Sequence, residues 1–376
     1  MTDRVDLHDA DASIELRAGR GTSRRGLLRA AGAWFAVGAG AVRAQPHPPI
    51  ADLHSHYGLI TRSLAGSGLA DDLRQQRVAL MAWKLVADGR WIGRTPAGIV
   101  QKSEPAPGEL IAYFHARLDR MKAYAAQHRL KTVLNAADVQ ACIAADGQAG
   151  IVLASEGADF LEGRLGNLQA AYDKGLRHLQ LVHYIRTPVG DYQTVPPVYN
   201  GLSALGRLLV EACNDRGVLV DLAHGSPQSV DQALQIARAP LVWSHGWVDH
   251  AGGRFTDPFG FLQRRLSLAQ AKAIADKGGV IGLWGLGLAH PRAGWSVAAR
   301  DTRAYANELA ALVDKIGRDH VAFGTDIEGV GPNWSVNDYT GVRAVLDHLQ
   351  QMKLPSETIE RVAYGNYARV LTAALG

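Results

Sequence analysis

Four short apolar stretches of this chain lead into residues of the kind that bind metal ions. The residues are His54 and His56 after residues 50–53, Glu156 after 150–153, His224 after 218–222 and His245 after 241–243. Zinc binds neutral imidazole and carboxylate groups. A carboxylate buried at the end of an apolar strand is costly unless it is paired or binds a metal. The pattern therefore predicts a metal site for hydrolysis.

The spacing of these residues predicts two ions. Side chains at positions i and i+2 of a strand point to the same face, so His54 and His56 can reach one ion together. His224 and His245 suit a second ion, and Glu156 has two oxygens that can bridge ions about 3.5–4 Å apart. We therefore expect two Zn²⁺ ions, although each histidine taken singly fits a hydrogen-bonded core residue equally well.

Two further polar residues follow apolar stretches and suit roles in catalysis. Asp326 follows residues 321–324 and could take a proton from an activated water and pass it to a leaving amine. His183 follows residues 179–182 and could polarise a substrate carbonyl group. The alternatives are a helix-capping or loop aspartate and a structural histidine.

Apolar stretches and helical patterns alternate along the chain. The eight candidate strands are residues 50–56, 79–83, 150–157, 178–184, 219–225, 240–246, 279–285 and 321–326. Such alternation indicates a parallel sheet, and eight strands fit a single (β/α)8 TIM-like barrel, an α/β fold with its active site at the carboxyl ends of the strands. A doubly wound open sheet, which binds ligands at one switch point, is the alternative. We also expect elaborated mouth loops, the longest between the second and third strands.

The first 44 residues have the features of a twin-arginine export signal. Arg24 and Arg25 precede an apolar stretch of small residues, and Val42-Arg43-Ala44 has the ending of a cleavage site. The apolar stretch has about 13 residues, short of the roughly 20 that span a bilayer, which disfavours a stable membrane anchor. Residues 1–44 are therefore predicted to be a signal peptide and residues 45–376 the barrel domain of a periplasmic or secreted protein.

Six stretches stand in order along the chain and share a pattern. They are Glu156-Gly157, residues 175–183, residues 219–224, Ser244-His245, Gly324-Thr325-Asp326 and residues 364–371. Together they resemble the membrane (renal) dipeptidase family, a branch of the amidohydrolase superfamily. The resemblance implies a two-zinc barrel that hydrolyses dipeptides, with His54, Glu156, His224 and His245 as metal ligands and Glu156 bridging.

The resemblance also implies roles for residues that face the substrate. Asp326 would be the acid/base, His183 would contact the substrate carbonyl, and Arg254 would hold the substrate carboxylate. The chain departs from the family at His56, where the family usually has Asp. The exchange removes a negative charge from the ligands, so we expect bound water to have a lower pKa and the substrate range to differ.

We therefore expect an exported zinc-dependent dipeptidase in which a hydroxide between the ions attacks the carbonyl, with Glu156 and Asp326 as catalytic residues. The alternatives are another amidohydrolase acting on an N-acyl amino acid, lactone or phosphoester, and a periplasmic metal-binding barrel without catalysis. The expected partner is a small dipeptide-like substrate, and a homodimer is left open. The net charge of +4 gives no reason to expect nucleic acid.

Replacing Arg24 and Arg25 by lysine should block export, because a receptor reads the twin-arginine pair and not its charge alone. Cell fractionation should find this variant in the cytoplasm, whereas Arg17→Lys with Arg20→Lys should be exported normally. Mass spectrometry of the exported wild type should find Gln45 at its N-terminus. Unchanged periplasmic yield of the first variant would point to another export route.

Overall fold

A computed structural model describes residues 47–60, 64, 66–95, 98–145, 148–249, 261–285, 288–290, 295–297, 301–329 and 335–376. The predicted export signal and Arg254 both lie outside the described residues, and their roles stay predictions. None of the described helices combines the length and apolar character needed to cross a bilayer.

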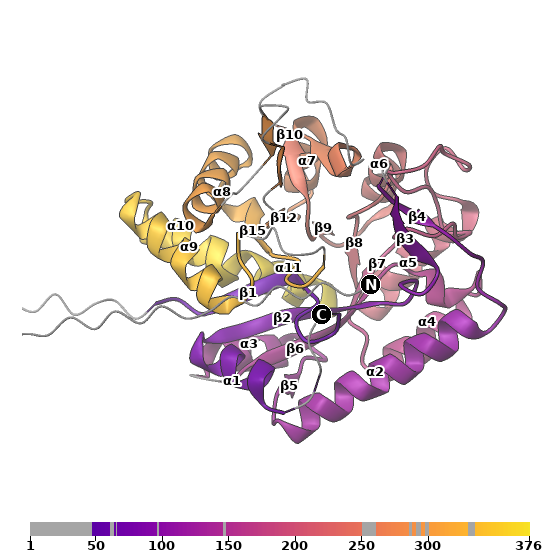
Figure 1. Ribbon diagram of the computed structural model, residues 1–376, viewed down its shortest axis with the longest axis horizontal. Helices are drawn as coiled ribbons and strands as arrows, with labels where there is room; N and C mark the ends of the chain where they lie inside the picture. The colour runs from indigo at the N-terminus through magenta and orange to yellow at the C-terminus, as the bar shows by residue number, and fades with distance from the viewer. Residues whose placement is uncertain are drawn as a thin grey trace, which may run out of the picture. The chain divides into compact units, whose positions relative to one another are not determined.

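Eight parallel strands form a closed ring (Figure 1). In spatial order they are β1 (Ile50–Ser55), β2 (Val78–Val86), β6 (Gly150–Glu156), β7 (His178–Gln180), β8 (Leu219–Asp221), β9 (Val242–Trp243), β12 (Val280–Trp284) and β15 (Val321–Gly324). Pairing of β2 with β6 and of β15 with β1 closes the ring, and the short β5 (Lys131–Thr132) adds to the start of β6. Each strand lies within or overlaps a predicted one. The predicted barrel is confirmed, and the open-sheet alternative is excluded.

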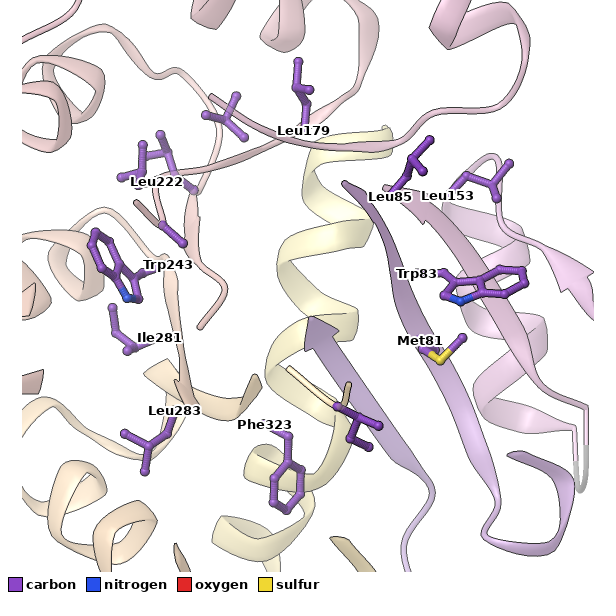
Figure 2. Packing of buried hydrophobic residues seen from close by; sticks show 14 of the residues in the cluster. Met81, Trp83, Leu85, Leu153, Leu179, Leu222, Trp243, Ile281, Leu283 and Phe323 are labelled. Atoms are coloured by element: carbon purple, nitrogen blue, oxygen red, sulfur yellow. The ribbon is translucent and has the colours of Figure 1, made fainter. Parts of the chain in front are cut away.

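The strands are buried on both faces, which explains why they read as continuous apolar stretches. On β2, Met81, Trp83 and Leu85 point outward and are fully or almost fully buried (Figure 2). Because side chains alternate along a strand, Leu80, Ala82 and Lys84 point inward. A polar side chain at an inward position must therefore find its partners inside the barrel.

Helices cover the outside of the ring. They are α1 (Gly68–Gln75), α2 (Glu109–Gln127), α3 (Ala136–Ala144), α4 (Gly166–Asp173), α5 (Ala204–Arg216), α6 (Pro227–Ile236), α7 (Leu268–Asp276), α8 (Thr302–Ile316), α9 (Tyr339–Gln351) and α10 (Ser356–Glu360). Several begin where a polar side chain accepts a hydrogen bond from the backbone three residues on, as Ser226 does from Ser229 N in α6. Capping of this kind fixes the helix start because it satisfies a backbone N–H that has no partner within the helix.

The C-terminal helix α11 (Asn366–Leu375) closes the amino ends of the strands. Tyr367, Val370 and Leu371 are fully buried and pack with strand residues such as Leu219 and Val280, and in Figure 1 the helix lies across the ring. The Asn366 side-chain amide donates to Val321 O at 2.8 Å, which ties the helix to β15. With this end filled, a ligand can enter the barrel only from the carboxyl ends.

The predicted mouth elaboration between β2 and the third ring strand contains a hairpin and a long helix. The hairpin is formed by β3 (Ile92–Thr95) and β4 (Gly98–Gln101), and α2 follows it. The helix α2 packs Phe114, Leu118 and Met121 into the core outside the barrel. The hairpin itself was not predicted.

Candidate metal centre

The five predicted ligands converge at the carboxyl ends of the strands. His54, His56 and Glu156 form one group that could hold an ion, and Glu156, His224 and His245 form another; within each group the ligand atoms lie within 4.8 Å of one another. Glu156 is at the centre, with the histidine Nε2 atoms 3.0–3.5 Å from its carboxylate oxygens. All five side chains are buried.

The candidate ligands lie at or just after the carboxyl ends of their strands. Glu156 is the last residue of β6, His224 lies three residues after the end of β8, and His245 lies two residues after the end of β9. The pairing of β1 with β2 shifts register between Asp52 and Ser55. His224 has a φ of 68°, in the left-handed region that costs a non-glycine residue roughly 1–2 kcal/mol. The site therefore contains local backbone strain.

Hydrogen bonds on the outer ring nitrogens direct the inner ones to the centre. His56 Nδ1 donates to Lys84 O at 2.8 Å, so in the neutral ring Nε2 carries a lone pair. Ser244 Oγ lies 2.8 Å from His54 Nδ1 and 3.2 Å from His245 Nδ1, and one hydroxyl oxygen can accept from both. Such outer hydrogen bonds are typical of histidines that bind metals.

The inner nitrogens face each other in pairs. His54 Nε2 lies 3.2 Å from His56 Nε2, and His224 Nε2 lies 3.2 Å from His245 Nε2. Wherever both rings of a pair are neutral with the proton on Nδ1, their Nε2 lone pairs repel, and a cation between them removes this conflict. The two groups of nitrogen and oxygen atoms that share Glu156 therefore fit divalent metal ions.

Burial and neighbouring charges place most of the ligands in the form that metals need. Burial alone would raise the pKa of Glu156, but His183, His54 and His56 hold it well below its usual range. Burial and then the Arg264 charge lower the pKa of His224 well below its usual value, and burial also lowers those of His245 and His54. His56 differs: although burial opposes it, the carboxylates of Glu156 and Asp326 raise its pKa to about 10.

Asp326 and His183 lie in the same cavity as the metal ligands. Asp326 Oδ1 is 3.1 Å from His56 Nε2, and its Oδ2 accepts from Trp284 Nε1 at 2.8 Å. His183 Nε2 is 3.5 Å from Glu156, and its Nδ1 lies 2.8 Å from an oxygen of Asp88. Asp88 was missed because the predicted second strand ended at residue 83, whereas β2 continues to Val86. Had the strand end been placed correctly, Asp88 would have stood out as a polar residue just after a buried strand.

The sequence reasoning also missed Arg264, which is fully buried beside the centre. One terminal nitrogen donates to Gln193 Oε1 at 3.0 Å and the other to His245 Nε2 at 2.8 Å. The guanidinium carbon lies 5.4 Å from the centre of the Trp284 ring. Arg264 ends a short 3-10 turn (Phe261–Arg264), where no strand-end pattern marks it.

A buried ion pair lies beneath the centre. Lys84 Nζ donates to Asp221 Oδ2 at 2.7 Å, and both side chains are fully buried. Asp221 Oδ1 also accepts from Ser244 N at 3.0 Å. Burial alone would raise the pKa of Asp221, but Lys84 and His178 hold it well below its usual range. The Lys84 carbonyl accepts from His56, and the Lys84 side chain pairs with Asp221, which in turn accepts from Ser244 N. Lys84 therefore connects the strands that carry the two histidine groups.

The cavity above the centre has a volume of about 200 Å³. It is lined by His56, Ile60, Val86, Gly89, Ile92, Ile99, Glu156, His183, Tyr184, His224, His245, Trp284, Asp326 and Gly329. One part of the lining is aliphatic and the rest is polar or aromatic. The cavity therefore suits a small ligand that has both an apolar part and polar groups.

A closed parallel barrel with a buried cluster of histidine and glutamate at the carboxyl ends of its strands is an arrangement found in metal-dependent hydrolases. The family described as membrane dipeptidase (peptidase family M19) matches residues 100–375, well over half of the chain. The chain belongs to this family, which confirms the resemblance found in the sequence.

Sequence identity to individual relatives is low. The chain is 27% identical to the uncharacterized protein in the pqqA 5′ region of Klebsiella pneumoniae over 273 residues, 70% of this chain and 97% of that protein. It is 33% identical to dipeptidase 3 of Mus musculus over 95 residues, which are 24% of this chain and only 19% of that protein. A Rhodobacter sphaeroides metallopeptidase, solved with a phosphinate mimic of L-Ala-D-Ala, has a TM-score of 0.71 at 22% identity, covering 87% of this chain and 99% of that one.

Lys84→Met should destabilise the metal-free protein by about 3–5 kcal/mol, because it leaves the Asp221 charge buried without its partner. The control is Lys174→Met, which breaks a pair with Asp119 at the surface, 2.6 Å apart, and should cost about 0–1 kcal/mol. Urea denaturation measures both free energies of unfolding. Equal losses would mean that the buried pair does not have the structural role assigned to it.

Metal binding should release a proton from His56, because its pKa of about 10 keeps it protonated near neutral pH. Below that pKa, affinity should therefore rise with pH. Calorimetric titration with Zn²⁺ in buffers of different ionisation enthalpy measures the number of protons released. The variant His56→Asp should release about one proton fewer, since an ordinary Asp is already ionised. Equal release by both proteins would contradict this assignment.

Proposed function

We propose that this chain is an exported zinc-dependent dipeptidase, acting in the periplasm or outside the cell. The observation that carries the proposal is a buried glutamate with four histidine Nε2 atoms 3.0–3.5 Å from its carboxylate, beside an aspartate that is not needed to complete either ligand group. Membership of the membrane dipeptidase family supports the reaction, and the twin arginines of the first 44 residues support export.

Two zinc ions are proposed because the cluster offers two groups of nitrogen and oxygen donors that share Glu156. Ions held there would lower the pKa of water and polarise the scissile carbonyl group. His54 and His56 would hold one ion, and His224 and His245 the other.

His183 is proposed to bind the substrate carbonyl oxygen. Its Nδ1 donates to the Asp88 carboxylate, which fixes the ring and leaves Nε2 directed at the cavity. Burial opposes protonation, but Asp88 and Glu156 outweigh it and raise the pKa of His183. The doubly protonated ring can donate from Nε2, which stabilises negative charge on the carbonyl oxygen as the bond is attacked.

Asp326 is proposed to move the proton from the attacking water to the leaving amine. The indole of Trp284 holds one carboxylate oxygen, and the other faces the centre 3.1 Å from His56. This arrangement keeps one oxygen in a set position for proton transfer.

Arg264 is proposed to receive the α-carboxylate of the dipeptide. A guanidinium group binds carboxylates well because its planar N–H groups match their geometry. Arg264 donates to His245 Nε2; if His245 held a metal ion through this nitrogen, the Arg264 N–H group would be available to an anionic ligand. Arg254 stays a prediction for the same role.

Asp326→Asn should lower dipeptide turnover by roughly 10²–10⁴, because an amide cannot accept the proton. The φ of 54° at this position suits asparagine as well as aspartate, so the fold should tolerate the change. Turnover is measured by the release of free amino acids from dipeptides. Elemental analysis measures the bound zinc, and the zinc content of the variant should match that of the wild type, near the proposed two equivalents per chain.

The matched control is Asp301→Asn at the start of α8, where the side chain accepts from Ala304 N. Asparagine caps a helix as well as aspartate does, so activity should persist. Near wild-type turnover of Asp326→Asn would refute the mechanism, whereas loss of its zinc would show that Asp326 is mainly a ligand. Failure of the wild type to hydrolyse any dipeptide would refute the function.

A further inference from the structure

We infer that the side chain of the first residue of the dipeptide lies against an apolar wall formed by Ile60, Val86, Ile92 and Ile99. The enzyme should therefore prefer dipeptides that begin with a large aliphatic residue. The inference rests on the proposed dipeptidase function and deepens it by naming a substrate class.

The apolar wall lines the same cavity as the metal ligands and comes from three segments. Ile60 follows β1, Val86 ends β2, and Ile92 and Ile99 belong to the hairpin. In that hairpin Ile92 pairs with Gln101, and Arg94 with Ile99. Cross-strand partners and residues two apart share a face, so Ile92 and Ile99 lie on one face of the hairpin, the face that meets the cavity.

The hairpin is held to the barrel. Gln101 Oε1 accepts from Arg186 N in the loop after β7 at 3.0 Å. Trp91 O accepts from Lys102 N at 2.7 Å, which closes the base of the hairpin. Ile92 also packs against a buried cluster of Trp91, Leu110 and Ile185. By contrast, Ile60 is 50% exposed, which leaves apolar surface at the cavity for a ligand to cover.

The wall and Arg264 lie on opposite sides of the barrel mouth. The ring order places β2 four strands from β9 in either direction. Val86 ends β2, and Arg264 bonds to His245, which follows β9. The metal centre is therefore between a cation on one side and the aliphatic side chains on the other.

This polarity sets the direction in which a dipeptide binds. With its α-carboxylate at Arg264 and its scissile carbonyl at the centre near His183, the first residue extends toward β1 and β2. An extended dipeptide spans at most about 7 Å, which suits a cavity of about 200 Å³ that the wall and the metal ligands line together.

A different reading of the same face would favour acidic first residues. Arg94 is exposed and lies opposite Ile99, so a glutamate side chain could reach its charge. Long cations normally keep the charged end in water, however, and the cavity lining at this side is aliphatic. We therefore favour aliphatic residues and include an acidic substrate in the test.

The experiment measures kcat/KM of the zinc-loaded mature chain for Gly-Gly, Ala-Gly, Leu-Gly, Glu-Gly and Gly-Leu. Leu-Gly should exceed Gly-Gly by roughly 10–200-fold, the range expected when a hydrophobic pocket accepts added methylene groups. Gly-Leu should gain much less. In Ile92→Ala with Ile99→Ala, the ratio of Leu-Gly to Gly-Gly should fall by about tenfold or more.

The matched control is Val100→Ala, which shortens a side chain on the other face of the same hairpin and should keep the wild-type ratio. The milder Ile99→Val should lower the ratio partly and guards against misfolding of the double variant. Equal rates for Leu-Gly and Gly-Gly, a preference for Gly-Leu or Glu-Gly, or a ratio unchanged in both isoleucine variants would overturn the inference while leaving the dipeptidase function standing. No hydrolysis of any dipeptide would overturn both.

Discussion

The carboxylate of Glu156 is the interaction on which this barrel depends. A buried negative charge needs partners, and here the partners are imidazole rings from three other strands, held at 3.0–3.5 Å. The outer nitrogens of His54, His56 and His245 are bonded to Ser244 Oγ or Lys84 O, which turns their inner nitrogens toward the centre. Positive charge at the centre, from a metal ion or from the proton on His56, compensates the carboxylate, so the site is complementary to a cation.

The charges beneath and beside this centre follow from the same constraint. Lys84 and Asp221 neutralise each other inside the barrel, and their backbones and side chains join the strands that carry the histidines. Asp88 compensates the charge on His183. The α11 helix fills the opposite end with apolar residues, so polar groups concentrate at one end of the strands and a substrate meets them from one direction.

Sequence reasoning predicted the barrel, and its candidate ligands lie together in the structure, because both depend on local order: apolar strands and the residues that follow them. It missed Asp88 because the end of β2 lay three residues beyond the predicted one. Arg264 and the hairpin residues Ile92 and Ile99 could not be found in this way. Contacts between distant segments, such as Gln101 with Arg186 and Arg264 with Gln193, hold them at or beside the cavity, and no periodicity encodes such contacts.

Two of the residues that face the centre, His224 and Asp326, have φ values of 68° and 54°. Glycine would adopt this backbone without steric cost, but it would also delete a buried side chain and, at Asp326, the hydrogen bond from Trp284. The two strand ends therefore combine an uncommon backbone conformation with side chains that face the metal centre. A substitution that relaxes the backbone there would remove the chemistry as well.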